Sequence, residues 1–109
     1  MATGRLGTAN ITTTSNTSVY TVPATTFSVV SVNVVNRSSS ASANIRIAVA
    51  SSGTPGIDEY IEYDSALVAN GVLERTGIVM DAGKILVVQT PTASPTLSVV
   101  VHGIETSTA

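Results

Sequence analysis

The 109-residue chain contains no cysteine and no tryptophan, and it has only one Phe, three Tyr and one His. Without cysteine, the chain has no disulfide framework, no thiolate nucleophile and no zinc site with cysteine ligands. Charged residues make up only 11% of the chain, its formal net charge is −2, and its five basic residues are scattered. Nucleic-acid binding needs clustered Lys and Arg, so the sequence gives no sign of that activity.

Long hydrophobic runs are also missing. No stretch approaches the ~20 apolar residues of a membrane-spanning helix. The opening Met-Ala-Thr-Gly-Arg-Leu-Gly has no apolar signal core. We therefore expect neither a membrane protein nor an exported one, and the absence of cysteine fits folding in a reducing cytoplasm.

Valine and threonine are the commonest residues, with sixteen each, followed by serine with fourteen. Val and Thr branch at Cβ, which favours a pleated strand over a helix. Turn residues interrupt the alternating runs about every ten residues, which is typical of an all-β sandwich or barrel. A chain of this length is expected to form one domain.

The predicted strands are residues 19–22, 26–36, 44–50, 59–67, 72–80, 84–90 and 96–104. Residues 26–36 carry apolar side chains on both faces, as in a central strand. Residues 44–50 alternate cleanly between apolar and polar, and we predict that 26–36 and 44–50 pair as a hairpin. A short helix within 57–69 stays open as the alternative to the strand at 59–67.

Turn signals complete the predicted organisation. Asn70-Gly71 predicts a type I′ turn, which needs positive φ at both positions, and residues 81–83 predict another turn. Residues 1–10 are expected as an extended N-terminal arm or a short first strand. Residues 11–105 are expected as the sandwich, beginning with a polar loop at 11–18, and residues 106–109 as a frayed tail. The predicted fold is an all-β antiparallel two-sheet sandwich of seven or eight strands, with jelly-roll or immunoglobulin-like topology.

The main concentration of charge is the acidic group Asp58, Glu59, Glu62 and Asp64. Such residues can form a divalent-cation site or a carboxylate pair for acid–base chemistry. We favour the alternative of a solvated edge strand whose charges prevent pairing with another sheet. On a regular strand, Glu62 and Asp64 would share one face while Glu59 lies on the other.

His102 is the single histidine and would have to act as the base of any Ser-His-Asp arrangement. The Gly-x-Ser-x-Gly elbow of many hydrolases does not occur in the chain. Because His102 shares a strand face with Val100 and Ile104, we favour a hydrogen-bonded structural role. We therefore predict no catalytic residue, no metal ligand and no cofactor, and we do not expect an enzyme.

Four residues are candidates for contacts with partners. Arg5 and Leu6 lie between two glycines in the possible arm, where Arg5 could pair with, and Leu6 could be buried against, a neighbouring subunit. Tyr60 and Tyr63 could contact a carbohydrate, although a buried tyrosine with a bonded hydroxyl is the commoner arrangement.

Three segments resemble small virion surface proteins of tailed phages, notably those that infect cyanobacteria. They are Glu-Tyr-Ile-Glu-Tyr-Asp (59–64), Asn-Gly-Val-Leu-Glu-Arg-Thr-Gly-Ile-Val (70–79) and Asp-Ala-Gly-Lys-Ile-Leu-Val (81–87). The opening seven residues and Val-Tyr-Thr-Val-Pro (19–23) are similar to the same group. The resemblance implies a β-sandwich on the particle, either on the head or on the neck, tail or fibre apparatus, and it supplies no catalytic residues.

The expected function is that of a capsid decoration (cement) protein, made in the host cytoplasm and located on the virion surface. Its partners would be the major capsid protein or other virion proteins, and a homotrimer is the favoured oligomer. No nucleic-acid or membrane partner is expected. A neck, tail or fibre-associated protein and a carbohydrate-binding module are the alternatives.

Overall fold

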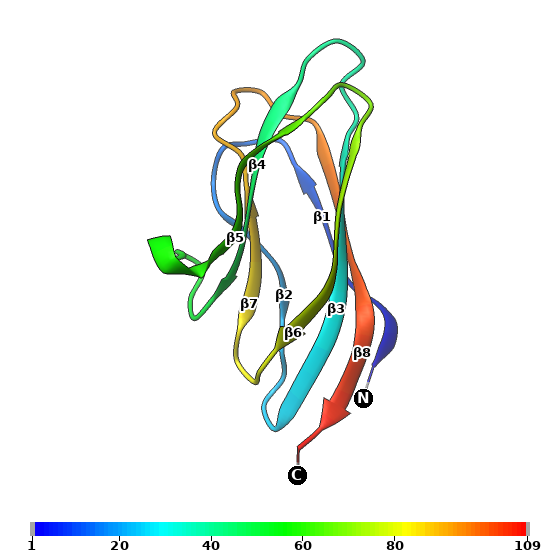
Figure 1. Ribbon diagram of the computed structural model, residues 1–109, viewed down its shortest axis with the longest axis vertical. Helices are drawn as coiled ribbons and strands as arrows, with labels where there is room; N and C mark the ends of the chain where they lie inside the picture. The colour runs from blue at the N-terminus through cyan, green and yellow to red at the C-terminus, as the bar shows by residue number, and fades with distance from the viewer. Residues whose placement is uncertain (1, 109) are drawn as a thin grey trace.

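The computed structural model describes residues 2–108, which form eight strands and one short 3-10 helix. In chain order these are β1 (Thr3–Ile11), β2 (Thr17–Thr21), β3 (Thr26–Asn36), β4 (Ala43–Ala50), η1 (Ile57–Glu59), β5 (Tyr60–Leu67), β6 (Val72–Met80), β7 (Ile85–Gln89) and β8 (Leu97–Ser107). Two four-stranded antiparallel sheets pack face to face (Figure 1). The predicted all-β sandwich is confirmed, and so is the strand predicted at 59–67, except that Glu59 belongs to η1 and the strand begins at Tyr60.

The strand order identifies the topology. One sheet, here called sheet A, has the order β1-β8-β3-β6, and the other, sheet B, has the order β2-β7-β4-β5. The pairs β1–β8, β2–β7, β3–β6 and β4–β5 are nested within one another, as in a long hairpin folded over into two layers. This is the arrangement of an eight-stranded jelly roll, so the strand order decides between the two topologies that the sequence leaves open.

The predicted hairpin between 26–36 and 44–50 is wrong, because β3 belongs to sheet A and β4 to sheet B. The connection between them crosses from one sheet to the other at the end of the sandwich. The buried side chain of Asn36 holds this connection, since its amide group donates to the carbonyl oxygens of Ala41 (2.9 Å), Leu67 (3.3 Å) and Val68 (3.3 Å). Alternation defines the two faces of a strand but does not choose its neighbour.

The turn at Asn70-Gly71 also connects different sheets, and it is not of type I′. Asn70 has a φ of 59°, whereas Gly71 does not have a positive φ. The Gly71 amide donates to the carbonyl oxygen of Val68 at 2.9 Å and closes the turn. The predicted turn at 81–83 is present, with Gly83 at a φ of 81° and the Lys84 amide donating to the Asp81 carbonyl at 3.2 Å.

Both ends of the described chain lie within sheet A. Residues 3–11 form the edge strand β1, so the first-strand alternative for 1–10 describes them, and the predicted polar loop at 11–18 is shortened at both ends. The frayed tail is a wrong prediction for 106 and 107, which pair with β3. Polar side chains do not prevent this pairing, because backbone groups form the ladder. Met1 and Ala109 lie outside the described residues.

The core lies between the sheets and is built mainly from aliphatic side chains. Val30, Val32 and Val34 of β3 are buried on its inner face, as are Ile45 and Ile47 of β4. Further buried aliphatic members are Ile11, Val22, Leu67, Ile78, Met80, Leu86, Val88, Leu97, Val99 and Val101. No helix within residues 2–108 is long and apolar enough to cross a membrane.

Candidate interaction surfaces

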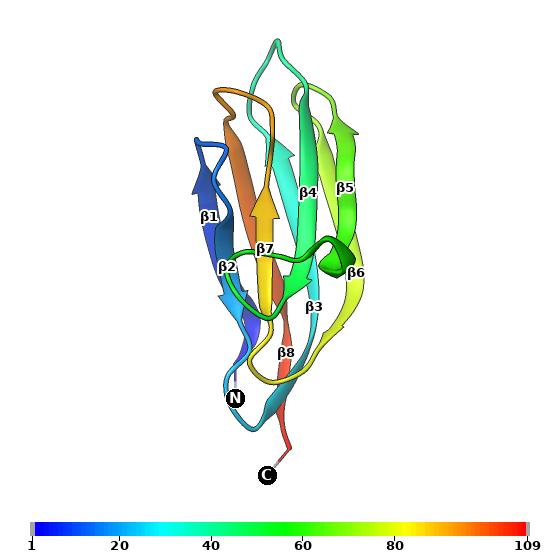
Figure 2. The same cartoon turned by 90° about the vertical axis from the view of Figure 1, so that its left-hand side faces the viewer.

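The outer face of sheet B is covered by the protein's own chain. Residues 51–59, which connect β4 to β5, cross this face over β7 (Figure 2). Ala48, Ala50 and Val87 on this face are at most 1% exposed, and Tyr60 and Ile85 pack against them. The Glu59 carboxylate accepts hydrogen bonds from the amides of Gly56 (2.8 Å) and Ser51 (3.1 Å), which fix the connection and lower the pKa of Glu59.

Tyr60 and Tyr63 meet on the outer side of β5 because that strand is irregular. The register of β5 against β4 shifts twice between Tyr60 and Ser65, so β5 carries extra residues there. Two tyrosines three residues apart, which would point in opposite directions on a regular strand, therefore lie on one face. Their ring centroids are 5.0 Å apart and the rings are inclined at 79°. Asp64, with a φ of 55°, follows directly.

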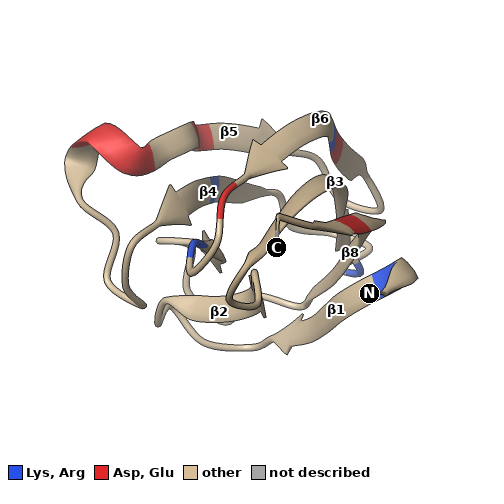
Figure 3. Cartoon of the chain, turned by 90° about the horizontal axis from the view of Figure 1, so that it is seen from below, with Lys and Arg blue, Asp and Glu red and all other residues tan. Residues whose placement is uncertain are grey.

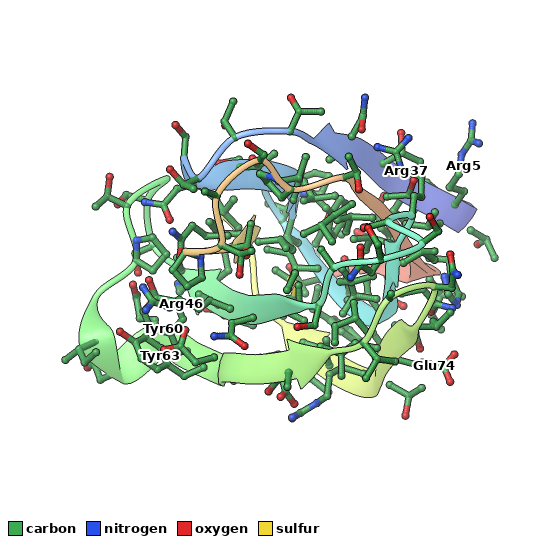
Figure 4. The ribbon with its side chains drawn as sticks, turned by 90° about the horizontal axis from the view of Figure 1, so that it is seen from above. Arg5, Arg37, Arg46, Tyr60, Tyr63 and Glu74 are labelled. Carbon is green, nitrogen blue, oxygen red and sulfur yellow. The ribbon has the colours of Figure 1, made fainter. Side chains whose placement is uncertain are left out.

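Arg46 completes this aromatic cluster, and Figure 4 shows it beside both tyrosines. Its guanidinium carbon lies 4.2 Å from the centroid of the Tyr63 ring. Its Nε and Nη2 atoms donate to the Asp64 carboxylate at 2.6 and 3.2 Å, which lowers the pKa of Asp64. The structure thus brings the two predicted tyrosines together and adds Arg46 and Asp64. Alternation places Arg46 outward, but no sequence signal reveals the bulges that bring the others to it.

The acidic group predicted at 58–64 is dispersed. Glu62 accepts hydrogen bonds from Ser65 and from Arg75 of β6, which hold its pKa below the ordinary value, whereas Asp64 binds Arg46. The prediction that Glu62 and Asp64 share a face is wrong, because the bulges separate them. Among residues 2–108, no three His, Asp or Glu side chains converge as a metal site. The predicted edge position of this strand is confirmed.

The outer face of sheet A is called the open face here, because no segment between residues 2 and 108 crosses it (Figure 1). Four of its apolar side chains are exposed: Phe27 (37%), Ile104 (49%), Val72 (58%) and Val79 (69%). Val29, Val35 and Val100 lie half-buried among them. A four-stranded surface is therefore left partly apolar and uncovered.

Three candidates from the sequence lie on or beside the open face. Arg5 of β1 is exposed and lies opposite His102 of β8. Leu6 lies at the bulge between Arg5 and Gly7 and packs against this chain's own core, so it is not free to anchor in a neighbouring subunit. His102 lies between Arg5 and Ser31 and makes no hydrogen bond through its ring to any described residue. The hydrogen-bonded role expected for His102 is therefore wrong.

Most charged side chains have partners within the chain. Figure 3 shows that acidic and basic residues are spread over the molecule. Ion pairs join Arg46 to Asp64, Arg75 to Glu62 and Lys84 to Asp81. Within residues 2–108, the charged side chains with neither an ion pair nor a hydrogen bond are Arg5, Asp58 and Glu74. Arg5 and Glu74 lie at opposite edges of sheet A (Figure 4).

A hollow of about 40 Å³ lies at one end of the sandwich, between residues 36–43 and 92–96. Its lining is uncharged, and its volume is far below that of a cofactor or substrate pocket. The site thus has the character of a surface rather than a cleft. Comparison of the chain with protein-family models, with curated proteins and with solved structures finds no match.

Proposed function

We propose that this chain is a capsid decoration protein that binds the surface of a tailed-phage head and stabilises the shell. Support comes from the resemblance of residues 59–64, 70–79 and 81–87 to phage virion proteins, and from the jelly-roll topology, an architecture of capsid and lectin domains. Because one fold hosts many functions, the proposal depends mainly on the properties of the protein surface.

The observation that carries the proposal is the open face. Antiparallel sheets with one solvated face normally alternate apolar inward and polar outward. Here Val72, Val79 and Ile104 remain about half exposed or more on the outward side. These exposed apolar side chains lie in two rows of one sheet face, and exposed apolar surface rimmed by polar residues marks interaction sites in soluble proteins. We take the open face to be an assembly surface.

Repetition explains how a small domain holds on to a particle. A shell presents the same surface many times, so weak contacts made by linked copies add up to tight binding. The proposed partners are the major capsid protein and further copies of this chain. The proposed location is the outside of the virion, after assembly in the host cytoplasm.

The test is to purify the phage particles whose genome encodes this chain and to count its copies by quantitative mass spectrometry. Hundreds of copies per particle support decoration of the head. A dozen or fewer support the alternative of a neck, tail or fibre protein. Absence from purified particles would refute both.

A carbohydrate-binding module is the second candidate, and the cluster of Tyr60, Tyr63 and Arg46 favours it. Tyr63 is 51% exposed, and tyrosine rings with charged neighbours are suited to sugar contacts. The cluster is also self-contained, because Arg46 covers one face of the Tyr63 ring and binds Asp64. Binding on a glycan array that is lost in Tyr63→Ala but kept in Tyr20→Phe would support this function, and an array without hits would contradict it.

A further inference from the structure

We propose that the open face packs against the open face of a second copy of this chain. The two-fold axis would run parallel to the strands, so that Arg5 of each copy meets Glu74 of the other. This inference rests on the proposed role of the open face as an assembly surface; it assigns that face to a second copy, and the other surfaces of the dimer are then left for the capsid. It is tested on the purified protein alone, so its failure is distinct from absence of the chain from particles.

Backbone register divides the open face into rows that cross the sheet from β6 to β1. In order along the strands, the rows are Val79, Val29, Ile104 and Thr3; then Ser31, His102 and Arg5; then Glu74, Asn33, Val100 and Thr8; and then Val72, Val35, Ser98 and Asn10. The first row is largely apolar, the last row is half apolar, and the two middle rows are mostly polar. The charged residues stand at opposite ends of the middle rows, Arg5 on β1 and Glu74 on β6.

The two unpaired charges select the direction of the axis. An axis parallel to the strands places β1 of one copy over β6 of the other and brings like rows together. Arg5 then lies one row, or about 7 Å along the strand, from the second copy's Glu74, which is within reach of an arginine side chain. An axis perpendicular to the strands would instead bring Arg5 towards Arg5 and Glu74 towards Glu74. Only the parallel axis gives two ion pairs and avoids like charges.

The open face is large enough for such a pair. Four strands spaced by about 4.8 Å, over about eight residue steps of 3.4 Å, cover roughly 500 Å² on each copy. Two such faces together reach about 1,000 Å², the lower bound for a specific interface. Face-to-face packing of sheets already occurs between sheets A and B, and the second copy would extend it by another layer.

A second copy explains why sheets A and B differ. Sheet B is covered by residues 51–59, and its half-buried Arg46 is paired with Asp64 within the chain. The open face has no such cover, and its two charged residues have no partner between residues 2 and 108. A surface that complements itself suits a two-fold dimer, whereas the trimer expected from the sequence would need two different complementary surfaces.

The first experiment measures the mass of the purified full chain in solution by sedimentation equilibrium at tens of micromolar. The expected mass is twice the 11.1 kDa of the chain. Val79→Asp should give a monomer, because it places an unpaired charge in the apolar first row. Val68→Asp is the matched control: Val68 is 66% exposed and Val79 69%, but Val68 lies in the β5–β6 turn and in none of the four rows of the open face. A monomeric or trimeric wild-type protein, or equal dimer loss in both variants, would overturn the proposal.

The second experiment reverses the charges and does not depend on the apolar row. Arg5→Glu and Glu74→Arg should each raise the dimer dissociation constant roughly tenfold, because each brings like charges together. The double variant Arg5→Glu/Glu74→Arg should recover most of the wild-type affinity. Both residues are exposed, so the fold should be kept, with circular dichroism as the check. A double variant no tighter than the single variants would refute the parallel axis.

Discussion

The outer faces of the two sheets have similar sequence patterns but differ in how far their apolar side chains are exposed to solvent. Val87 on sheet B and Val79 on sheet A both point away from the central core, yet Val87 is 1% exposed and Val79 is 69% exposed. The difference lies in residues 51–59, which cross sheet B and have no counterpart on sheet A. Whether an outward valine stabilises the monomer or is left for a partner therefore depends on a distant connection.

The largest expected effect comes from the covered valine. Val87→Ala should lower the free energy of unfolding by about 2 kcal/mol, from lost burial plus the cavity left under residues 51–59. Val79→Ala, the same change on the open face, should stay within about 0.5 kcal/mol for the isolated monomer. Urea denaturation of both variants measures the difference, at protein concentrations below the dimer dissociation constant so that the protein is monomeric. Equal losses would mean that the two faces are not covered differently.

The next effect concerns a polar link between the sheets. The Tyr20 hydroxyl, on β2 of sheet B, donates to Glu105 Oε2 of sheet A at 2.6 Å, and the Ser28 hydroxyl lies 2.6 Å away. Tyr20→Phe leaves the fully buried Ser28 without this partner and should cost about 1–2 kcal/mol. Tyr63→Phe is the control, since the exposed Tyr63 hydroxyl has no hydrogen bond within residues 2–108. Thermal unfolding that is unchanged in Tyr20→Phe would contradict the link.

A second link closes the opposite side of the sandwich, where Glu62 of β5 bonds Arg75 of β6. Glu62→Gln should reduce stability by about 1 kcal/mol, because the pair is only partly buried and water screens it. The loss should shrink in 1 M salt, whereas the loss in Val87→Ala should not. Salt-independent destabilisation by Glu62→Gln would show that shape rather than charge matters at this position.

These links also predict how stability depends on pH. The hydrogen bond from Tyr20 lowers the pKa of Glu105, and those from Ser65 and Arg75 lower that of Glu62. Their contribution is present above the ordinary value of 4.5 and is lost as the pH falls through the folded-state values. Burial and the bond to Glu105 raise the pKa of Tyr20 to about 12, so its contribution is present below pH 10 and is lost between 10 and about 12. Melting temperatures across pH 2–12 should show a plateau with both flanks, and Tyr20→Phe should flatten the alkaline flank.

The smallest effect is expected at the aromatic cluster of sheet B. Arg46→Gln removes the contact with the Tyr63 ring and the bonds to Asp64, and both of these partners are exposed to solvent. Its melting temperature should fall less than that of Glu62→Gln, and the dimer mass should not change. Loss of the dimer in Arg46→Gln would move the proposed interface from sheet A to sheet B.

The sequence predicted the positions of the strands better than the pairing between them. Period-two alternation located β3, β4 and β8 because burial on one face repeats every second residue. It misplaced the partner of β3, because the sheet to which a strand belongs is decided by packing between distant segments. The nested order of the eight strands is a property of the whole chain, and no local pattern encodes it.

For the candidate surfaces too, single residues could be identified from the sequence, whereas their contacts depend on the fold. Tyr60 and Tyr63 were identifiable as residues, but their contact depends on bulges that leave no clear mark in the sequence. Arg5 was identifiable for its charge, and Glu74 only became relevant when β6 was placed in the same sheet. The open face itself was unpredictable, because exposure depends on where residues 51–59 pass.

The position of β8 between β1 and β3 has a consequence for biosynthesis. Residues 3–11 and 26–36 leave the ribosome long before residues 97–107, which must separate them, have been translated. Sheet A can therefore be completed only after residues 97–107 have been translated, and such distant pairings form slowly. During that interval the nascent valine-rich segments are open to aggregation, so the yield in a cell will depend on how quickly β8 pairs with β1 and β3 or on how well chaperones shield the unpaired strands.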